Sequence, residues 1–137
     1  MIVDIDGTLS NSCNRRVFDF KACVDDKVIE PVKKLVSMAW DQGHTIIMMS
    51  GRDSICREET EDWLYKKYIN YDLLYMRKEK DNRQDTIVKQ ELFDNHIRGK
   101  YQPMFVIDDR PCVLQMWIEL GLFVMNVNQD PYATNKF

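Results

Sequence analysis

The sequence of 137 residues has little of several features that mark particular classes of protein. Five glycines and four prolines are too few for a collagen-like or low-complexity chain. No apolar run approaches the ~20 residues that cross a bilayer. The four cysteines (Cys13, Cys23, Cys56 and Cys112) form no C-x-x-C pair, and the two histidines complete no zinc motif with them. We therefore expect a soluble protein with free thiols in a reducing compartment and no membrane partner.

An excess of positive charge is also absent, since the net charge is −3. This argues against a broad basic surface that binds long duplex nucleic acid, although it does not exclude local binding of the end of one nucleic-acid strand. No charged-then-apolar leader opens the chain, so we expect an intracellular, cytoplasmic location. The length predicts one domain over residues 1–137.

Short apolar runs alternate with longer amphipathic ones, which indicates an α/β protein: a three-layer, Rossmann-like domain around a central, mainly parallel five-stranded sheet. Residues 6–25 read as an irregular polar connection. Strands are predicted over 1–5, 45–49, 71–76, 104–107 and 122–127, and helices over 30–42, 54–69, 85–97 and 111–120.

Acidic residues follow two of the predicted strands. Right-handed crossovers place the carboxyl ends of all five strands at one edge of the sheet, so Asp4, Asp6, Asp108 and Asp109 are expected to converge there. Four carboxylates repel one another unless a cation lies among them. With oxygen ligands and no nearby His or Cys, the expected cofactor is Mg²⁺.

The segment from Asp4 to Thr8 carries the most specific chemistry. A carboxylate at a strand end, here Asp4, can attack phosphorus and form an acyl-phosphate. Asp6, two residues later, can protonate the departing oxygen and then activate water. Gly7 allows a sharp turn, and the Thr8 hydroxyl can brace the two acids.

This DxDGT pattern resembles the first motif of the haloacid dehalogenase (HAD) superfamily of phosphotransferases. Ser50-Gly51-Arg52 resembles the second motif, in which a hydroxyl and a backbone amide hold a phosphate oxygen. Lys89 resembles the cation of the third motif. Asp108-Asp109 resembles the metal-holding fourth, which implies Asp109 as a direct ligand and Asp108 as a direct or water-mediated one. The resemblance covers essentially the whole chain and implies a HAD-like fold with only a minimal cap.

Three stretches narrow the resemblance to the 3′-phosphatase domain of phage-type polynucleotide kinase/phosphatases. They are residues 85–93, 106–110 and 113–117. The resemblance implies Arg15, Arg52 and Asp85 as further active-site contacts. No G-x-x-x-x-G-K-[ST] loop occurs, so kinase activity is not predicted.

The resemblance thus implies a phosphoric monoester hydrolase that removes 3′-phosphate from DNA or RNA ends, and from nucleoside 3′-phosphates, in a host cytoplasm if a phage encodes it. The expected metal ligands are Asp4, Asp6, Asp108 and Asp109. The expected catalytic residues are Asp4, Asp6, Ser50, Arg52 and Lys89, and the expected substrate-binding residues are Thr8, Arg15, Gly51 and Asp85.

Three alternatives stay open from the sequence. The domain could be a HAD phosphatase for a small metabolite, a receiver-like domain that accepts a phosphoryl group without turnover, or a binding remnant. Motif order disfavours a receiver, because a receiver has its phosphorylated Asp after a later strand and lacks the Gly-Thr turn. The sequence does not decide between DNA and RNA, and it leaves a homo-oligomer open.

Overall fold

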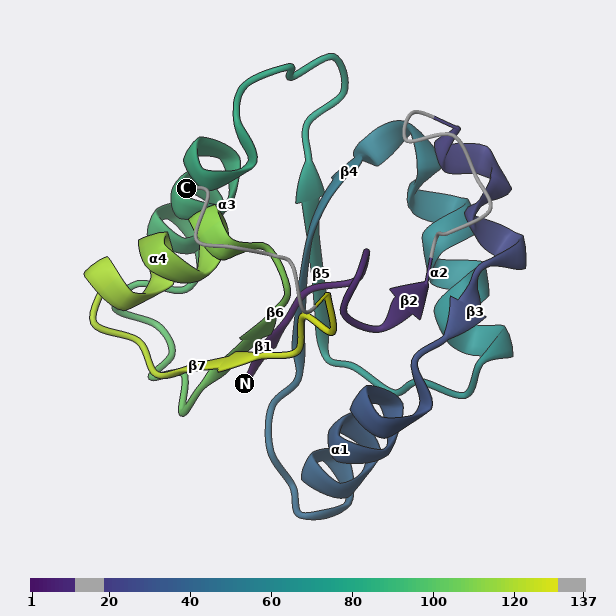
Figure 1. The fold of residues 1–137 in the computed structure, drawn as a ribbon, viewed down its shortest axis with the longest axis horizontal. Coiled ribbons are helices and arrows are strands. Elements are labelled where there is room, and N and C mark those ends of the chain that lie inside the picture. The colour runs from purple at the N-terminus through teal and green to yellow at the C-terminus, as the bar shows by residue number, and fades with distance from the viewer. Residues whose placement is uncertain (12–18, 131–137) are drawn as a thin grey trace.

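The computed structural model describes residues 1–11 and 19–130, and its centre is a five-stranded sheet of order β5-β4-β1-β6-β7 (Figure 1). The neighbouring strands of this sheet pair in parallel. The strands span Ile2–Val3 (β1), Ile47–Asp53 (β4), Leu73–Arg77 (β5), Val106–Asp108 (β6) and Val124–Asn126 (β7). The predicted α/β class and five-stranded parallel sheet are confirmed.

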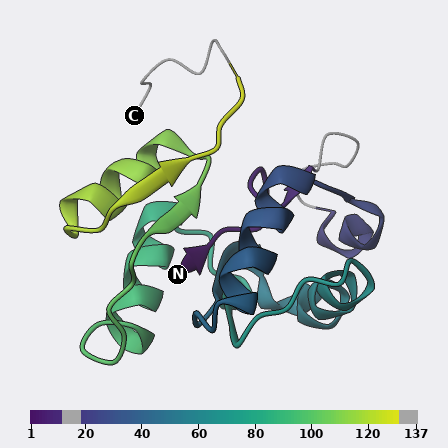
Figure 2. The same cartoon turned by 90° about the horizontal axis from the view of Figure 1, so that it is seen from below.

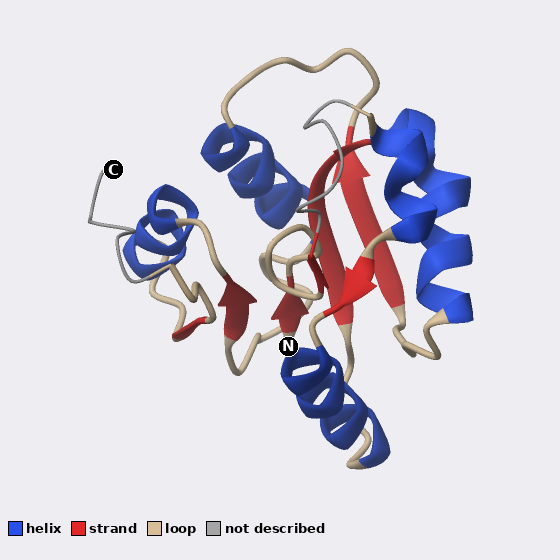
Figure 3. Cartoon of the chain, turned by 45° about the vertical axis from the view of Figure 1, so that its right-hand side comes forward, coloured by secondary structure: helices blue, strands red, loops and turns tan. Residues whose placement is uncertain are grey.

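Two pairs of helices cover the two faces of the sheet (Figures 2 and 3). One pair is α1 (Glu30–Asp41) and α2 (Arg57–Lys66), and the other is α3 (Asp85–His96) and α4 (Pro111–Glu119). Each face has its own apolar core, with the fully buried Trp63 in one and Trp117 in the other. None of the helices in the described part of the chain is long and apolar enough to span a membrane.

The central strand β1 is short but paired on both sides. Val3 lies opposite Met48 of β4 and Ile107 of β6. Successive side chains of a strand point to opposite faces, so Val3 joins the core under α1 and α2 while Ile2 joins the core under α3 and α4. Asp4 therefore emerges at the carboxyl edge in the middle of the sheet.

Strand β4 continues beyond its predicted end at residue 49 and includes the Ser50-Gly51-Arg52 motif. A register shift between Ser50 and Asp53 marks a β-bulge against β5. Bulges change the direction of side chains near active sites, and this one begins where the polar motif begins. A Ser-Gly pair looks like the end of a strand in the sequence, which is why the prediction stopped early.

The helix predicted over 54–69 begins with a 3-10 turn and ends earlier than expected. It consists of a 3-10 turn, η2 (Ser54–Cys56), followed by α2. The side chain of Asp53 accepts a hydrogen bond from the Ile55 amide and begins the turn. Tyr68 adopts a φ of 56°, a left-handed conformation that a helix cannot continue.

The segment predicted as an irregular connection contains regular structure. β2 (Ser10–Asn11) pairs antiparallel with β3 (Lys27–Val28), and η1 (Phe20–Asp25) packs against α2. Two-residue strands and a single 3-10 helix leave no periodic pattern in a sequence. Among the described residues, this region adds a two-stranded sheet and one short helix beside the carboxyl edge of the main sheet.

Candidate active site

Three carboxylates meet at the carboxyl edge of the sheet. Asp4 follows β1, Asp108 ends β6, and Asp109 is the next residue. One oxygen from each lies within 4.8 Å of the others. Asp4 and Asp108 are buried, and Asp109 is half-buried. The structure thus brings together acids from opposite ends of the polypeptide.

The ammonium group of Lys89 lies between two of these carboxylates. Nζ donates to Oδ1 of Asp4 at 2.7 Å and to Oδ2 of Asp108 at 2.8 Å. Burial alone lowers the pKa of Lys89, but Asp108 and Asp4 outweigh this effect and raise the pKa above its ordinary value. Lys89 is therefore protonated and neutralises one of the three negative charges.

Burial and the negative charge that Lys89 does not neutralise raise the pKa values of two of the acids, Asp4 and Asp109. Burial raises the pKa of Asp4 well above its ordinary value, with Asp108 and Asp109 adding to the shift against the opposing effect of Lys89. Burial and the Asp108 charge likewise raise the pKa of Asp109. A cation relieves such repulsion, and a donor set made only of carboxylate oxygens fits a hard divalent ion. These three aspartates could hold a metal.

Asp108 is oriented by donors on both of its oxygens. The main-chain amides of Asp109 and Arg110 donate to Oδ1 at 2.9 and 3.2 Å. The indole Nε1 of Trp117 lies 3.4 Å from Oδ2, which also accepts from Lys89. Asp108 is thus held in a single orientation by the start of α4 and by a core tryptophan.

Gly7 and Thr8 lie in the loop after β1 and contact the carboxylates of the site. The Thr8 hydroxyl lies 3.2 Å from Oδ2 of Asp4 and 3.3 Å from Oδ1 of Asp109, so it bridges the two acids. Gly7 has a φ of +82°, and a Cβ at this position would overlap the Asp109 carboxylate. Both the backbone conformation and the space therefore require glycine.

The Asp6 carboxylate faces Arg52. Nε and Nη2 of Arg52 donate to the two carboxylate oxygens at 2.8 and 2.7 Å, and the Ser10 hydroxyl donates to Oδ1 at 3.2 Å. This forked pair fixes the plane of the carboxylate. The group of three clustered aspartates does not include Asp6, and its predicted part in metal binding stays a prediction.

Arg52 is buried and bonded to protein groups through all three guanidinium nitrogens. Besides Asp6, it donates to Oδ2 of Asp26 at 3.1 Å and to Oγ1 of Thr60 at 3.3 Å. The sequence predicted Arg52 as a catalytic residue; in the structure its guanidinium group is bonded to Asp6, Asp26 and Thr60, and its catalytic role stays a prediction. The buried Ser50 accepts a hydrogen bond from the Arg52 main-chain amide at 3.1 Å.

Asp85 connects the second motif to two arginines. Its Oδ1 accepts from Arg77 at 2.9 Å and its Oδ2 accepts from Arg110 at 3.2 Å. A Cβ on Gly51 would overlap Oδ1 of Asp85, so only glycine permits this close approach. Arg77 also donates to the Gly51 carbonyl at 2.7 Å and thereby ties β5 to the motif.

Of the predicted site residues, Arg15 lies outside the described residues. Conversely, Asp26 was not assigned to the site from the sequence. Arg77 and Arg110 were not in the expected catalytic or substrate-binding set, although the edge rule places Arg110 with the acid pair at the carboxyl edge of the sheet. Asp26 follows η1, whose residues carry no periodic signal.

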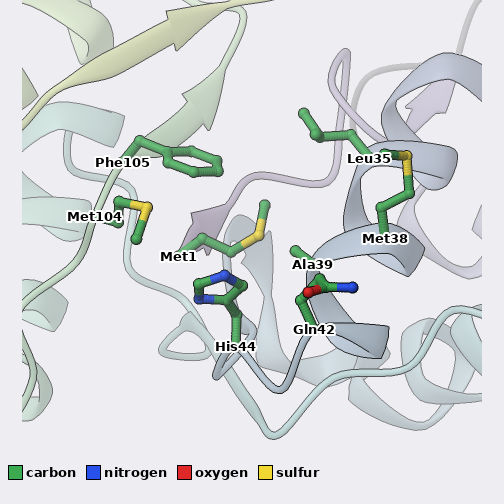
Figure 4. A pocket seen from close by; sticks show the side chains of 8 residues that line it. All are labelled: Met1, Leu35, Met38, Ala39, Gln42, His44, Met104 and Phe105. Carbon is green, nitrogen blue, oxygen red and sulfur yellow. The ribbon is translucent and has the colours of Figure 1, made fainter.

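An apolar hollow of about 180 Å³ lies at the opposite end of the strands (Figure 4). It is lined by α1 and by residues that precede β1, β4 and β6, including Met1, His44 and Phe105. No acid lines it, and it is remote from the carboxyl edge where the three aspartates gather.

The fold and the site together define a phosphotransferase of the HAD type: a parallel sheet whose central strand ends in Asp4, followed in order by a Ser-Gly turn, a buried lysine and an acid pair. Residues 1–132 match the family described as the polynucleotide kinase PNKP phosphatase domain (HAD_PNKP), and the chain belongs to this family. It is therefore a phosphatase domain.

Its relatives are larger proteins. The chain is 37% identical over 134 residues to the "Putative bifunctional polynucleotide kinase/RNA ligase" of Autographa californica nuclear polyhedrosis virus, covering 95% of this chain and 19% of that protein. Two solved structures, described as "Structure of the Pnkp1/Rnl/Hen1 RNA repair complex" and "Structure of Pnkp1/Rnl/Hen1 complex", each match 93% of this chain with 44% identity and a TM-score of 0.91. The match covers 41% and 45% of those chains, so this chain spans less than half the length of these relatives.

Proposed function

We propose that this domain removes the 3′-phosphate from polynucleotide ends, and from nucleoside 3′-phosphates, through an acyl-phosphate on Asp4. The observation that carries the proposal is the meeting of Asp4, Lys89, Asp108 and Asp109 at the carboxyl edge in a chain of the PNKP phosphatase family. The relatives are described as a polynucleotide kinase/RNA ligase and as part of an RNA repair complex, which favours RNA ends as the substrate.

Asp4 is the nucleophile in this proposal. Lys89 holds its Oδ1 and Thr8 lies against its Oδ2, so the carboxylate has a fixed orientation before the substrate arrives. Preorganised charge stabilisation of this kind is a large part of enzymatic catalysis. Lys89 also offsets the charge that develops on the phosphoryl oxygens during in-line attack.

Asp6 is the general acid and base. It lies two residues from the nucleophile and outside the clustered carboxylates, with its orientation set by Arg52 and Ser10. In the first step Asp6 gives a proton to the departing 3′-oxygen, and in the second it takes one from the water that cleaves the aspartyl-phosphate. Arg52 keeps the carboxylate aligned in both steps.

Asp4, Asp108 and Asp109 would hold Mg²⁺, which when bound offsets negative charge on the phosphate. The fit rests on their oxygen-only donor set and on their mutual repulsion. The Ser50 hydroxyl and the Gly51 amide would hold a phosphate oxygen, with Asp85 and its two arginines fixing that turn.

A panel of substrates tests the proposal. Initial rates are measured with Mg²⁺ on a 3′-phosphorylated RNA oligonucleotide, its DNA counterpart, the same RNA with a 5′-phosphate, and a set of sugar phosphates and 5′-nucleotides. The proposal predicts a kcat/KM for the 3′-phosphorylated RNA that exceeds those for the 5′-phosphorylated RNA and the metabolites by roughly 10³ or more. A higher kcat/KM for any of the metabolites would contradict the proposal that polynucleotide ends are the substrate.

A further inference from the structure

Two cysteine side chains meet beside the residues that orient Arg52. Cys23 belongs to η1 and Cys56 to η2, and both are fully buried. Their sulfur atoms lie 4.0 and 3.8 Å from the same atom, Oγ1 of Thr60. That oxygen also accepts the hydrogen bond from Nη1 of Arg52 at 3.3 Å. The mechanism proposed above uses neither thiol.

The environment favours the thiolate form of Cys23 over that of Cys56. A hydrogen bond with Cys56 lowers the pKa of Cys23 to about 7, and the nearby Arg52 charge acts in the same direction. The same hydrogen bond, together with burial, raises the pKa of Cys56. A thiolate beside a protonated thiol is the arrangement in which one sulfur reacts with an oxidant and the other resolves the product.

We propose that a peroxide converts Cys23 and Cys56 to a reversible disulfide and that this modification lowers phosphatase activity through Thr60 and Arg52. The cysteine pair is then a modification site that couples the active site to an oxidant. The effect on activity rests on the phosphatase function, whereas the formation of the disulfide does not.

The chemistry balances with hydrogen peroxide as the oxidant. The Cys23 thiolate attacks one peroxide oxygen, the O–O bond breaks, and the departing hydroxide takes a proton and leaves as water. Cys56 then attacks the sulfur of the Cys23 sulfenic acid, the S–O bond breaks, and the Cys56 proton leaves with the oxygen in a second water. Two thiols are oxidised by two electrons and one peroxide is reduced. A small oxidant suits a pair that is buried from solvent.

A disulfide changes the contacts of Thr60. Both thiols are free in the structure, so a bond of about 2.05 Å between the sulfur atoms requires at least one of them to move relative to Oγ1 of Thr60. Oxidation also removes the S–H group of Cys56 and the thiolate charge of Cys23 near Arg52. Since Arg52 holds both oxygens of Asp6, a displaced Thr60 disturbs the alignment of the general acid and base.

The test uses the full chain with Cys13 and Cys112 changed to Ser, so that only the pair can react. The protein is treated with hydrogen peroxide, and intact mass and non-reducing peptide mapping report the bond independently of activity. We expect the loss of two hydrogen atoms, a Cys23–Cys56 linked peptide, a fall in kcat of roughly tenfold or more, and full recovery with dithiothreitol. The matched variants Cys23→Ser and Cys56→Ser in this background should form no disulfide and keep their activity under peroxide.

Three outcomes would overturn the inference. The first is peroxide treatment that yields no linked peptide. The second is a linked protein with unchanged kcat. The third is an equal loss of activity in the two serine variants.

The role of Thr60 in transmitting the effect to Arg52 is tested with Thr60→Val in the same background. There the disulfide should form, but it should change kcat by less than about twofold from the value of the reduced variant. A fall as large as in the parent protein would show that Thr60 does not transmit the change.

Discussion

The Nζ atom of Lys89 lies 2.7 Å from Oδ1 of Asp4, joining the middle of α3 to the end of the central strand. This contact places a buried cation against the proposed nucleophile. Because Asp108 shares the same ammonium group, Lys89 compensates acids from two neighbouring strands. We expect both the stability of the sheet edge and the proposed chemistry to depend on this contact.

Lys89→Met removes this charge while keeping most of the length of the side chain. We expect kcat to fall by roughly 10²- to 10³-fold, because the developing phosphoryl charge loses its fixed counter-charge. Unfolding should become easier by about 3–5 kcal/mol in EDTA, since buried carboxylates lose their partner. Lys66→Met, which breaks only an exposed pair with Asp62, is the control and should change either value little. Equal effects of the two changes in urea unfolding and steady-state assays would contradict this role.

Asp109→Asn is expected to stabilise the protein without metal. The raised pKa of Asp109, caused by burial and by Asp108, means that at neutral pH the fold disfavours the ionised form, and this cost disappears as pH falls through the folded pKa. In EDTA at pH 7 the Tm of Asp109→Asn should exceed that of the unchanged protein by roughly 3–6 °C. Adding Mg²⁺ should raise the Tm of the unchanged protein and have a smaller effect on the variant. Thermal scans in which Mg²⁺ raises both Tm values equally would show that Asp109 does not hold the ion.

Arg52→Lys tests whether the forked contact with Asp6 matters more than its charge. A lysine keeps the charge but cannot donate to both carboxylate oxygens in one plane. We expect kcat to fall by roughly 10²-fold with little change in KM, because Asp6 loses its alignment for proton transfer. Arg98→Lys, on an exposed pair with Asp94, is the matched control. A rise in KM with unchanged kcat would instead place Arg52 on the substrate phosphate, as the sequence predicted.

Gly51→Ala is expected to lower activity by displacing Asp85. The added Cβ would overlap Oδ1 of Asp85, and Gly51 is not among the glycines with positive φ, so the cost comes from the contact alone. If so, Gly51→Ala combined with Asp85→Ala should be no less active than Asp85→Ala by itself. A double-mutant cycle measures this coupling. Fully additive losses would show that the glycine acts through another group.

Much of the fold was predictable because its signals are local. Helix starts at Glu30, Asp85 and Pro111 fall where they were predicted. The parallel order of the strands follows from their alternation with helices. The predicted end of β4 at residue 49 was wrong, because the strand continues with a bulge through Ser50 and Gly51. A bulge depends on the pairing with the neighbouring strand rather than on the local sequence.

The site residues that directly follow strands were predictable from the sequence. Those that reach the site from helices packed beside the sheet were not. The meeting of Asp4 with Asp108 and Asp109 follows from the edge rule. The approach of Asp26 and Thr60 to Arg52 depends on how η1 and α2 pack, which no spacing in the sequence records.

Trapping of the covalent intermediate tests the central claim most directly. A 3′-[³²P]phosphorylated RNA oligonucleotide is mixed with excess protein and Mg²⁺, quenched in acid within the first turnover, and the labelled protein is digested and mapped. The proposed mechanism predicts acid-stable, alkali-labile label on the peptide that contains Asp4, and no labelled protein with Asp4→Asn or in EDTA. Release of inorganic phosphate by Asp4→Asn at the rate of the unchanged protein, or label on any other residue, would contradict it.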